Sequence, residues 1–388
     1  MEFKEYLMED ALAAIIDYRG KTPQKSESGV PTLSAKSVKN NYINYAECYY
    51  ISEAEYKRFM VRGFPQKGDI LITTEAPMGM VARLDREDIA IAQRLLTLRG
   101  KEGVLDNDYL LYLLQSPYGQ GLLKAKETGT TVTGIKQSEF RRIVIKLPDF
   151  AVQKKVSSVL NAIDSKILCH AKINDNLLAQ AQAIFMQRFI MDKIEGDEKP
   201  LYDFADYING AAFKPSECGD HGLPIIKIVE LKNGITDSTK YFDGFKGEKY
   251  LIQDKDILFS WSGNPDTSID IFIWTHGKAI LNQHTFNVKS NTGHRWFTFL
   301  MLKYFKPEFS RIASNKQTTG LGHVTATDLK RLTFVFNKDA IEAFEHEVNP
   351  FMETIYSNMM ENNRLEQLRD NLLPKLMSGE IDVSDIQL

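Results

Sequence analysis

The two halves of this 388-residue sequence carry the same landmarks in the same order, about 190 residues apart. Gly-Val-Pro at 29–31 returns as Gly-Leu-Pro at 222–224, and Asp-Ile-Leu at 69–71 returns as Asp-Ile-Leu at 256–258. Each half then ends in a long stretch of helical character. Solenoid repeats run about 20–50 residues, so this repeat indicates a duplicated domain followed by a duplicated helix. Two similar halves suit a ligand with two similar sites, such as duplex DNA.

The composition is that of an ordinary globular protein, with 43% hydrophobic and 26% charged residues. No apolar run approaches the roughly 20 residues of a membrane span and no secretory signal is apparent, so we expect no membrane association and a cytoplasmic location. Cys48, Cys169 and Cys218 form no C-x-x-C pair, which favours a reducing compartment and argues against a zinc site. With a formal net charge of −3, any DNA-binding face must be a local basic patch.

Both globular regions have the mixed pattern of an α+β fold. Runs rich in Ile, Leu, Phe and Thr predict strands at 69–74, 95–99, 142–147, 224–229, 256–260 and 269–274. Helices are predicted at 108–126, where Pro117 should interrupt the helix, and at 296–304. Loops rich in Thr and Gly at 128–134 and 315–322 occupy matching places in the two halves.

Two long helices separate these globular regions. Residues 152–190 contain no Pro or Gly, and a seam with alternating spacings of four and three runs through Ile163, Ile167, His170, Asn174, Leu177, Ala181 and Ile184. A helix of about 39 residues would be roughly 60 Å long, so it needs a partner helix. Residues 341–377 supply one, with a seam at Val348, Ile355, Met359, Asn362, Leu365 and Leu372. A break or kink at Pro350 would leave most of that helix intact.

The order of segments then predicts the architecture. The linker at 195–200 is too short for parallel pairing of the helices, which would require a long return connection. We therefore expect an α+β protein with an approximate twofold, in which an antiparallel coiled coil of two long helices separates two globular domains. The expected segments are a first domain at 1–148, a first helical segment at 149–195, a second domain at 196–337, and a second helical segment with the C-terminal tail at 338–388.

The motifs of common catalytic sites are missing. The sequence has no P-loop, GxSxG or HExxH motif and no Gly-rich dinucleotide fingerprint, and its Asn-Pro dipeptides lack the second Pro expected in an adenine methyltransferase. Pro148-Asp149 followed by Asp164 and Lys166 resembles the metal-binding pattern of restriction nucleases. However, Asp164 and Lys166 lie two residues apart on a predicted helix and point in different directions, which favours solvated charges. We predict no catalytic and no metal-binding residues.

Candidate DNA contacts are the Lys and Arg side chains that suit phosphates and the polar side chains that suit base edges. In the first domain they are Arg19, Lys21, Thr22, Lys25, Lys36, Lys39, Thr73, Thr74, Gln93, Arg94, Thr130, Thr131 and Lys136. In the second they are Lys214, Lys227, Lys232, Ser260, Ser262, Asn264, Gln283, His284, Lys316, Gln317, Thr318 and His323. These segments occupy matching places in the two domains but carry different residues. That pattern is expected if each domain reads a different half of a DNA site. Gln93 and Gln283 equally suit buried amides on a strand.

Asn174 and Asn362 occupy equivalent points of the two predicted helices. One interpretation is that they are tolerated polar positions of the seam. The other is that they fix the register or orientation of the pair, as buried Asn does in coiled coils.

The helical segments carry a resemblance to a known family. Leu-Pro at 147–148, Gln153, Leu160, Ile163-Asp164 and Ile167 in the first segment, with Asn174 and Leu177 following, resemble the helical repeat of the specificity subunits of type I restriction–modification systems. The run Leu-Arg-Asp-Asn-Leu-Leu-Pro-Lys-Leu-Met-Ser-Gly-Glu-Ile at 368–381 resembles the C-terminal repeat of that family closely. The Thr/Gly loop at 130–136 and the strand at 68–71 also resemble its target-recognition domains. The first repeat departs from the pattern, because it ends in Gln-Arg-Phe-Ile at 187–190.

The resemblance implies that each globular domain is a target-recognition domain for one half of a bipartite DNA sequence, and that the coiled coil sets the spacer. It also implies two methyltransferase subunits that methylate adenine with S-adenosylmethionine, and two motor-nuclease subunits that complete the restricting complex and use ATP and Mg²⁺. The chain itself would bind no cofactor and be a non-catalytic subunit. The alternatives are a structural DNA-organising coiled-coil protein and a stand-alone nuclease or methyltransferase. The half-site sequences, the spacer length and the presence of a nuclease stay open.

Overall fold

The computed structural model describes residues 2–129, 133–317 and 321–384. The chain forms two compact units. Unit 1 comprises Met1–Ser165 and Glu366–Leu388, and unit 2 comprises Lys166–Leu365. The last segment of the chain therefore belongs to the same unit as the first, and each unit holds one portion of each long helix.

Unit 1 is built on a four-stranded antiparallel sheet in the order β2-β10-β7-β8, with bounds Leu12–Asp17, Leu95–Gly100, Ile70–Thr73 and Val81–Arg83. A second sheet, β6-β3-β9 (Tyr49–Ile51, Val30–Leu33, Ala90–Ile91), contains a parallel pair between β3 and β9. Two short antiparallel pairs complete the strands: β1 (Phe3–Leu7) with β11 (Val144–Pro148), and β4 (Val38–Lys39) with β5 (Tyr42–Ile43).

The helices of unit 1 are α1 (Met8–Ala11), α2 (Glu53–Phe59), α3 (Asn107–Gln115), α4 (Pro117–Ala125) and α5 (Gln137–Arg141), with a 3₁₀ turn η1 at Tyr45–Glu47. The side chain of Asp106 caps α3 by accepting from the amide of Tyr109 at 2.9 Å. Ser116 caps α4 in the same way and Pro117 fills its first turn, where the missing N–H costs nothing. Pro117 therefore interrupts the 108–126 helix as predicted.

Unit 2 repeats the strand order of the main sheet with other residues and adds one strand to the second sheet. Its four-stranded antiparallel sheet has the order β13-β21-β17-β19, with bounds Ala205–Asn209, Thr285–Ser290, Ile257–Ser260 and Asp270–Ile273. Its second sheet is β15-β14-β20-β16 (Tyr241–Phe242, Leu223–Ile226, Ala279–Leu281, Leu251–Ile252), again with a parallel pair, β14 with β20. The pairs β12 (Asp197–Pro200) with β23 (Thr333–Phe336) and β18 (Ser262–Gly263) with β22 (Gly322–His323) complete its strands.

The helices of unit 2 are α7 (Ile228–Asn233), α8 (Arg295–Tyr304), α9 (Lys306–Asn315) and α10 (Ala326–Arg331), with 3₁₀ turns η3, η4 and η5 at Leu201–Phe204, Pro215–Glu217 and Glu248–Tyr250. The strand predicted at 224–229 is too long, because β14 ends at Ile226 and Val229 lies in α7. The carboxylate of Glu230 accepts from the amide of Lys227 at 3.0 Å, which starts the helix there.

The long helices are α6 (Phe150–Phe185), which continues as a π-helical turn η2 at Met186–Met191, and α11 (Lys338–Ser378). The predicted seam is correct, because its residues on α6 are buried or half-buried between exposed neighbours. α11 runs through Pro350 without a break. Val348 and Met352 on either side of that proline are fully buried in the core of unit 2, which holds the helix together there.

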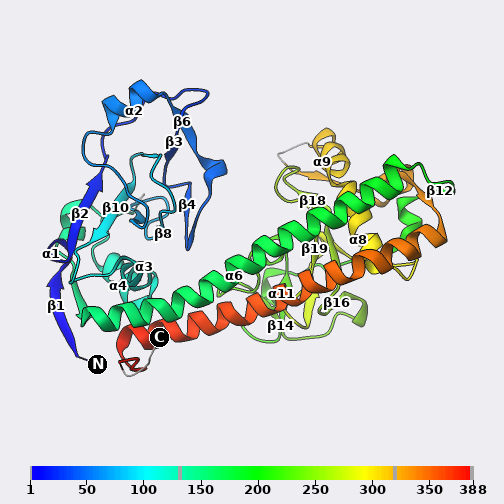
Figure 1. Ribbon diagram of the computed structural model, residues 1–388. Coiled ribbons are helices and arrows are strands. Elements are labelled where there is room, and N and C mark those ends of the chain that lie inside the picture. The colour runs from blue at the N-terminus through cyan, green and yellow to red at the C-terminus, as the bar shows by residue number, and fades with distance from the viewer. Residues whose placement is uncertain (1, 130–132, 318–320, 385–388) are drawn as a thin grey trace. The chain divides into compact units, whose positions relative to one another are not determined.

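The two helices pair antiparallel through polar contacts in unit 2, where they run side by side (Figure 1). The Nδ1 atom of His170, a side chain only 3% exposed, lies 2.8 Å from the amide oxygen of Asn362. One turn further along α6, the amide of Asn358 donates to Asn174 Oδ1 at 2.8 Å. In unit 1, Arg369 of α11 donates to Asp164 of α6 at 3.0 Å, and the hydroxyl of Tyr112 donates to the same carboxylate at 2.7 Å. Asp164 is therefore a structural carboxylate.

Candidate nucleic-acid interface

In unit 1, four segments far apart in sequence meet at the end of the four-stranded sheet where β2 and β7 finish and β10 begins. We call this the loop end. The amide of Thr74 donates to the carbonyl of Arg94 at 3.0 Å, and the amide of Ile135 donates to the carbonyl of Thr74 at 2.9 Å. The guanidinium of Arg19 donates to the carbonyl of Ile135 at 3.1 Å. The loop after β2, the β7–β8 turn, the turn before β10 and the Thr/Gly loop therefore form one surface.

Unit 2 assembles the equivalent segments at its own loop end. The amide of Gln283 donates to the carbonyl of Ala211 at 2.9 Å, which joins the turn before β21 to the loop after β13. Ser262 pairs with His323 in the β18–β22 ladder, which joins the β17–β19 turn to the Thr/Gly loop. The ring of His284 lies 5.8 Å from that of Trp261. Ser262, Asn264, Gln283, His284 and His323 are thus brought to one end of the sheet.

Most sequence-predicted candidates have accessible side chains. In unit 1, Lys21, Thr22, Lys25, Lys36, Arg94 and Lys136 are exposed, and Arg19, Lys39 and Gln93 are half-buried. In unit 2, Lys214, Lys227, Lys232, Asn264, Gln283, His284, Gln317 and His323 are exposed, and Ser262 and Lys316 are half-buried. Thr130, Thr131 and Thr318 lie outside the described residues. Gln93 and Gln283 are therefore not the fully buried strand amides of the alternative interpretation.

Three candidates are buried, which corrects the expectation that they face a ligand. Thr73 and Ser260 are the last residues of the central strands β7 and β17, and Thr74 follows the first of these. The hydroxyl of Thr73 donates to the carbonyl of Pro77 at 2.6 Å and accepts from the amide of Met80 at 2.9 Å. Thr73 therefore shapes the β7–β8 turn. The hydroxyl of Ser260 is sealed in the sheet, with no partner among the described residues.

Several basic candidates lie away from the loop ends. Lys25 sits 4.8 Å from the centre of the Tyr49 ring on β6, while Lys36 and Lys39 lie beside and within β4. In unit 2, Lys227 precedes α7 and Lys232 lies within it, and the ammonium of Lys232 donates to the carbonyl of Thr267 in the β17–β19 turn, which joins α7 to the loop end. Lys25, Lys36 and Lys39 therefore belong to the second sheet of unit 1 and the segments beside it, whereas Lys232 adjoins the loop end of unit 2.

The loop ends also contain polar residues that the sequence did not single out. Glu75 forms an ion pair with Arg94 at 2.7 Å and a β-bridge with Gly134. Trp261 donates its indole N–H to Asn209 at 3.2 Å and stacks on the Phe286 ring at 5.5 Å. Trp261 takes the place after β17 that Thr74 takes after β7, so the repeat alignment could have identified it. An indole beside an imidazole can stack on a base or pack against a sugar.

Ion pairs reduce the positive charge available at these surfaces. Arg19 lies 3.2 Å from the carboxylate of Asp17, and Arg94 is paired with Glu75. Lys316 pairs with Asp328, where burial alone would raise the carboxyl pKa. The hydrogen bonds from Lys316 and Thr325 outweigh that effect and hold the pKa of Asp328 below its ordinary value. Lys21 and Lys136 are exposed cations near the loop end of unit 1 that suit phosphates.

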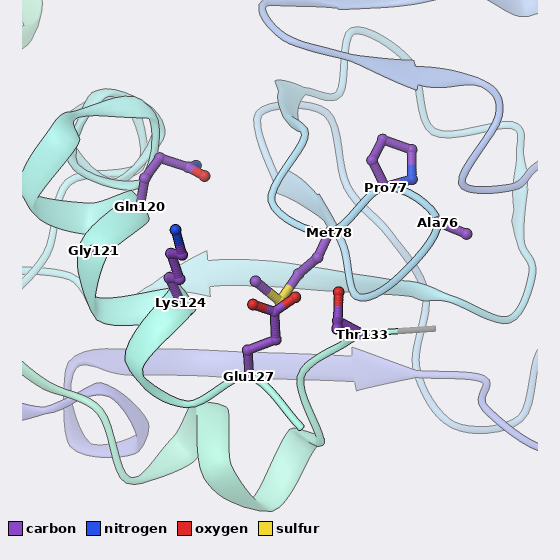
Figure 2. Close-up of a pocket in the computed structure, with 8 residues that line it drawn as sticks. All are labelled: Ala76, Pro77, Met78, Gln120, Gly121, Lys124, Glu127 and Thr133. Carbon is purple, nitrogen blue, oxygen red and sulfur yellow. The ribbon is translucent and has the colours of Figure 1, made fainter. Parts of the chain in front are cut away.

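A hollow of about 620 Å³ borders the β7–β8 turn of unit 1 (Figure 2). Lys124 and Glu127, from α4 and the residues after it, line it opposite the turn at Ala76, Pro77 and Met78. Gln120 closes one side by donating to the carbonyl of Gly79 at 2.9 Å. The hollow is open and its charges are mixed, so it extends the candidate surface without defining a separate ligand site.

The described parts of the chain contain neither a cluster of metal-ligating side chains nor a helix suited to span a membrane. Within residues 2–129, 133–317 and 321–384, no three His, Cys, Asp or Glu side chains gather as metal ligands would. No helix among these residues combines the length and apolar character needed to cross a bilayer.

Comparison with known proteins identifies the family. The family model described as the type I restriction modification DNA specificity domain matches residues 14–179 and again 194–367, once in each half. The MjaIX type I restriction enzyme specificity subunit of Methanocaldococcus jannaschii is 25% identical, and the similarity covers 92% of this chain and 88% of that protein. The HindI specificity subunit of Haemophilus influenzae is 20% identical, covering 81% and 87%.

A solved structure supports the fold. The crystal structure of the type I restriction–modification S subunit from M. genitalium superposes with a TM-score of 0.55 at 16% identity, covering 97% of this chain and 96% of that one. Because the family model matches both halves of the repeat, the chain belongs to the type I restriction–modification DNA specificity family.

Proposed function

We propose that this chain is the subunit that gives a type I restriction–modification complex its DNA sequence specificity, with each globular domain reading one half of a bipartite site. One observation carries the proposal. In both units, the same four connections meet at one end of the same four-stranded sheet, while the side chains that they present differ. The chain therefore contains the same kind of surface twice, with different side chains on each. Two such surfaces suit two short half-sites of different sequence.

The division of labour follows the segments of the chain. Residues 1–148 and 196–337 act as the two target-recognition domains, and the helical segments 149–195 and 338–388 set the spacer and bind the methyltransferase subunits. Two methyltransferase subunits supply adenine methylation with S-adenosylmethionine, and two motor-nuclease subunits join when the complex restricts, using ATP and Mg²⁺. This chain contributes recognition and performs no catalytic step.

Recognition divides between phosphate and base contacts. Exposed cations such as Lys21 and Lys136 bind phosphates, so affinity falls with salt at a slope of about 0.9 per phosphate contact. Amides and imidazoles such as Gln93, Gln283 and His284 suit hydrogen bonds with base edges, each contributing about 1–3 kcal/mol of discrimination. The partner methyltransferase must extrude its target adenine, so the two domains hold the duplex while the base flips.

The test is a map of methylated adenines in cells with and without this chain, with the methyltransferase partner left in place. The proposal expects one bipartite adenine motif to disappear when the chain is deleted, and to return when it is restored. An unchanged methylation pattern in cells with an active partner would reject the proposal. It would favour a protein that organises DNA without directing methylation.

A further inference from the structure

A basic segment of unit 1 runs from the last turn of α2 into the loop that precedes β7. Residues 57–67 contain Lys57, Arg58, Arg62 and Lys67 and no carboxylate. Glu55 neutralises Arg58 through two hydrogen bonds of 2.8 Å. Lys57, Arg62 and Lys67 are exposed, and the carboxylate of Glu87 approaches this segment by accepting from the amide of Lys67 at 3.3 Å. The segment therefore presents a local excess of positive charge in a chain of net charge −3.

Two large apolar side chains are exposed within this basic segment. Val61 is 64% exposed and Phe64 is 56% exposed, whereas Phe59 and Met60 just before them are buried in the core. The buried pair anchors the turn, so the outward position of Val61 and Phe64 is not a sign of a loose chain. Apolar side chains surrounded by cations are typical of surfaces that enter a nucleic-acid groove.

The turn is also held rigidly beside the loop end. Arg62 donates to the carbonyls of Asp17 and Arg19 at 3.1 and 3.0 Å. The hydroxyl of Tyr18 donates to the carbonyl of Gly63 at 2.8 Å and accepts from the amide of Arg62 at 2.8 Å. Because Arg19 in turn binds the carbonyl of Ile135, the turn is continuous with the candidate interface. A preorganised turn loses little conformational freedom on binding.

We propose that the turn at 60–64 is a DNA-contacting element of unit 1, in which Val61 and Phe64 make apolar contact in a groove of its half-site. The inference rests on the proposed function and names a further determinant of it. Double-stranded DNA is the occupant that the surface favours, because cations flank both side chains and because the turn adjoins the loop end. Arg62 is a positioning residue that holds the turn against the loop after β2.

The experiment compares Val61→Ala, Phe64→Ala and the double variant in the complex with methyltransferase subunits. Binding to the bipartite duplex found by methylation mapping is measured by fluorescence anisotropy over a range of salt concentrations. Val144→Ala is the matched control, since Val144 is 45% exposed on β11 and undergoes the same chemical change as Val61. We expect about tenfold weaker binding by the double variant. The salt slope should not change, because no charge is removed. The control should bind like the unaltered complex.

The possible results separate the inference from the function on which it rests. If the double variant binds the duplex with unaltered affinity, the inference is overturned. It is also overturned if the double variant no longer assembles with methyltransferase subunits, because the turn would then contact protein and not DNA. The unaltered complex is first tested against duplexes with either half-site scrambled. If it does not distinguish them from the bipartite duplex, the proposed function fails, and this inference fails with it.

Discussion

Arg94 shows how backbone geometry and a candidate ligand contact coincide at a single residue. Its φ of 73° is in the left-handed region, which a side chain with a Cβ rarely adopts. The carbonyl of Arg94 accepts from the amide of Thr74, and its guanidinium pairs with Glu75, so the strained turn presents an arginine at the loop end. Strain kept at a surface position is characteristic of functional sites.

Replacing Arg94 with glycine in one variant and with alanine in another separates the effect of backbone strain on stability from the effect of the side chain on DNA binding. Both changes remove the ion pair with Glu75, which is worth at most about 1 kcal/mol at the surface. Only glycine relieves the backbone, so Arg94→Gly should be more stable than Arg94→Ala by about 1 kcal/mol in urea unfolding. Both variants should bind the bipartite duplex several-fold more weakly. If both variants bound the duplex as tightly as the unaltered chain, we would conclude that Arg94 does not contact DNA.

The residue scale also shows where a sequence pattern fails. Thr73, Thr74 and Ser260 suited base contacts by residue type, yet each is buried, because the strands that they end lie in the middle of a sheet. Burial of a strand end depends on which strands pair beside it, and these partners are distant in sequence. Residue type therefore identified Lys21, Gln93 and Arg94 as accessible polar groups but could not separate them from the buried hydroxyls.

Among the elements, the paired helices have two adjacent polar layers, His170 with Asn362 and Asn174 with Asn358. The sequence predicted Asn174 and Asn362 as equivalent positions, but it did not show that each bonds to a different partner on the opposite helix. Sliding one helix by a heptad would place His170 opposite Ile355 or Arg369 and leave its bond with Asn362 unmade. We propose that these layers favour the observed register.

A double-mutant cycle on the Asn174–Asn358 layer measures how strongly it favours the observed register. Asn174→Leu or Asn358→Leu alone leaves a half-buried amide without its partner and should cost about 1–2 kcal/mol of unfolding free energy. The double leucine variant should recover most of that loss, because neither polar group remains. Asn176→Leu, on an exposed position of α6, is the control and should change stability by less than about 0.5 kcal/mol. Additive losses in the double variant would argue against a coupled pair.

The half-buried carboxylate of Asp270 joins a strand and two helices in unit 2, so the stability of unit 2 should depend on pH. Asp270 at the start of β19 receives hydrogen bonds from Lys303 of α8 at 2.7 Å and Lys306 of α9 at 2.9 Å. Burial alone would raise the pKa of Asp270, but the two ammonium groups outweigh it and hold the pKa below its ordinary value. This contribution to stability is present above the unfolded-state pKa of about 4 and is lost as pH falls through the folded-state pKa.

Asp270→Asn tests this linkage. The variant should be less stable than the unaltered chain at pH 7, by about 1–2 kcal/mol, since two ammonium groups lose their counter-charge. Between about pH 5 and pH 2 the difference should shrink, because the unaltered chain then loses the same interaction. Urea unfolding across this range gives the measurement. A stability difference that stayed constant with pH would show that the carboxylate charge is not what matters.

Elements with a strong local signal were predictable and the rest were not. The long helices and β7, β10, β17 and β19 follow from periodicity and apolar runs, and Pro117 fixed the division between α3 and α4. The second sheets were missed as sheets, because strands as short as Ala90–Ile91 or Leu251–Ile252 carry no period of their own. The convergence of the loops was equally hidden, since it depends on hydrogen bonds such as that from Arg19 to Ile135 across 116 residues of sequence.

For the whole molecule, the duplication is its main feature. Both units have the same strand order, the same parallel pair in a second sheet and the same short ladder that precedes a long helix. The equivalent sheet positions conserve a charge pair, Asp69 with Arg99 in unit 1 and Asp256 with Lys289 in unit 2. The loop ends differ, with Arg94 and Glu75 in one and Trp261 and His284 in the other. A constant framework with variable loops suits two readers with different targets.

The most direct test of this account exchanges residues 1–148 for the corresponding domain of a relative with a known target and maps adenine methylation in cells that hold the methyltransferase partner. The account predicts that one half of the bipartite motif changes to that of the relative, while the other half and the spacer length stay the same. If a folded, assembled chimera changed both halves together, or neither, the claim that each domain reads one half-site would be contradicted.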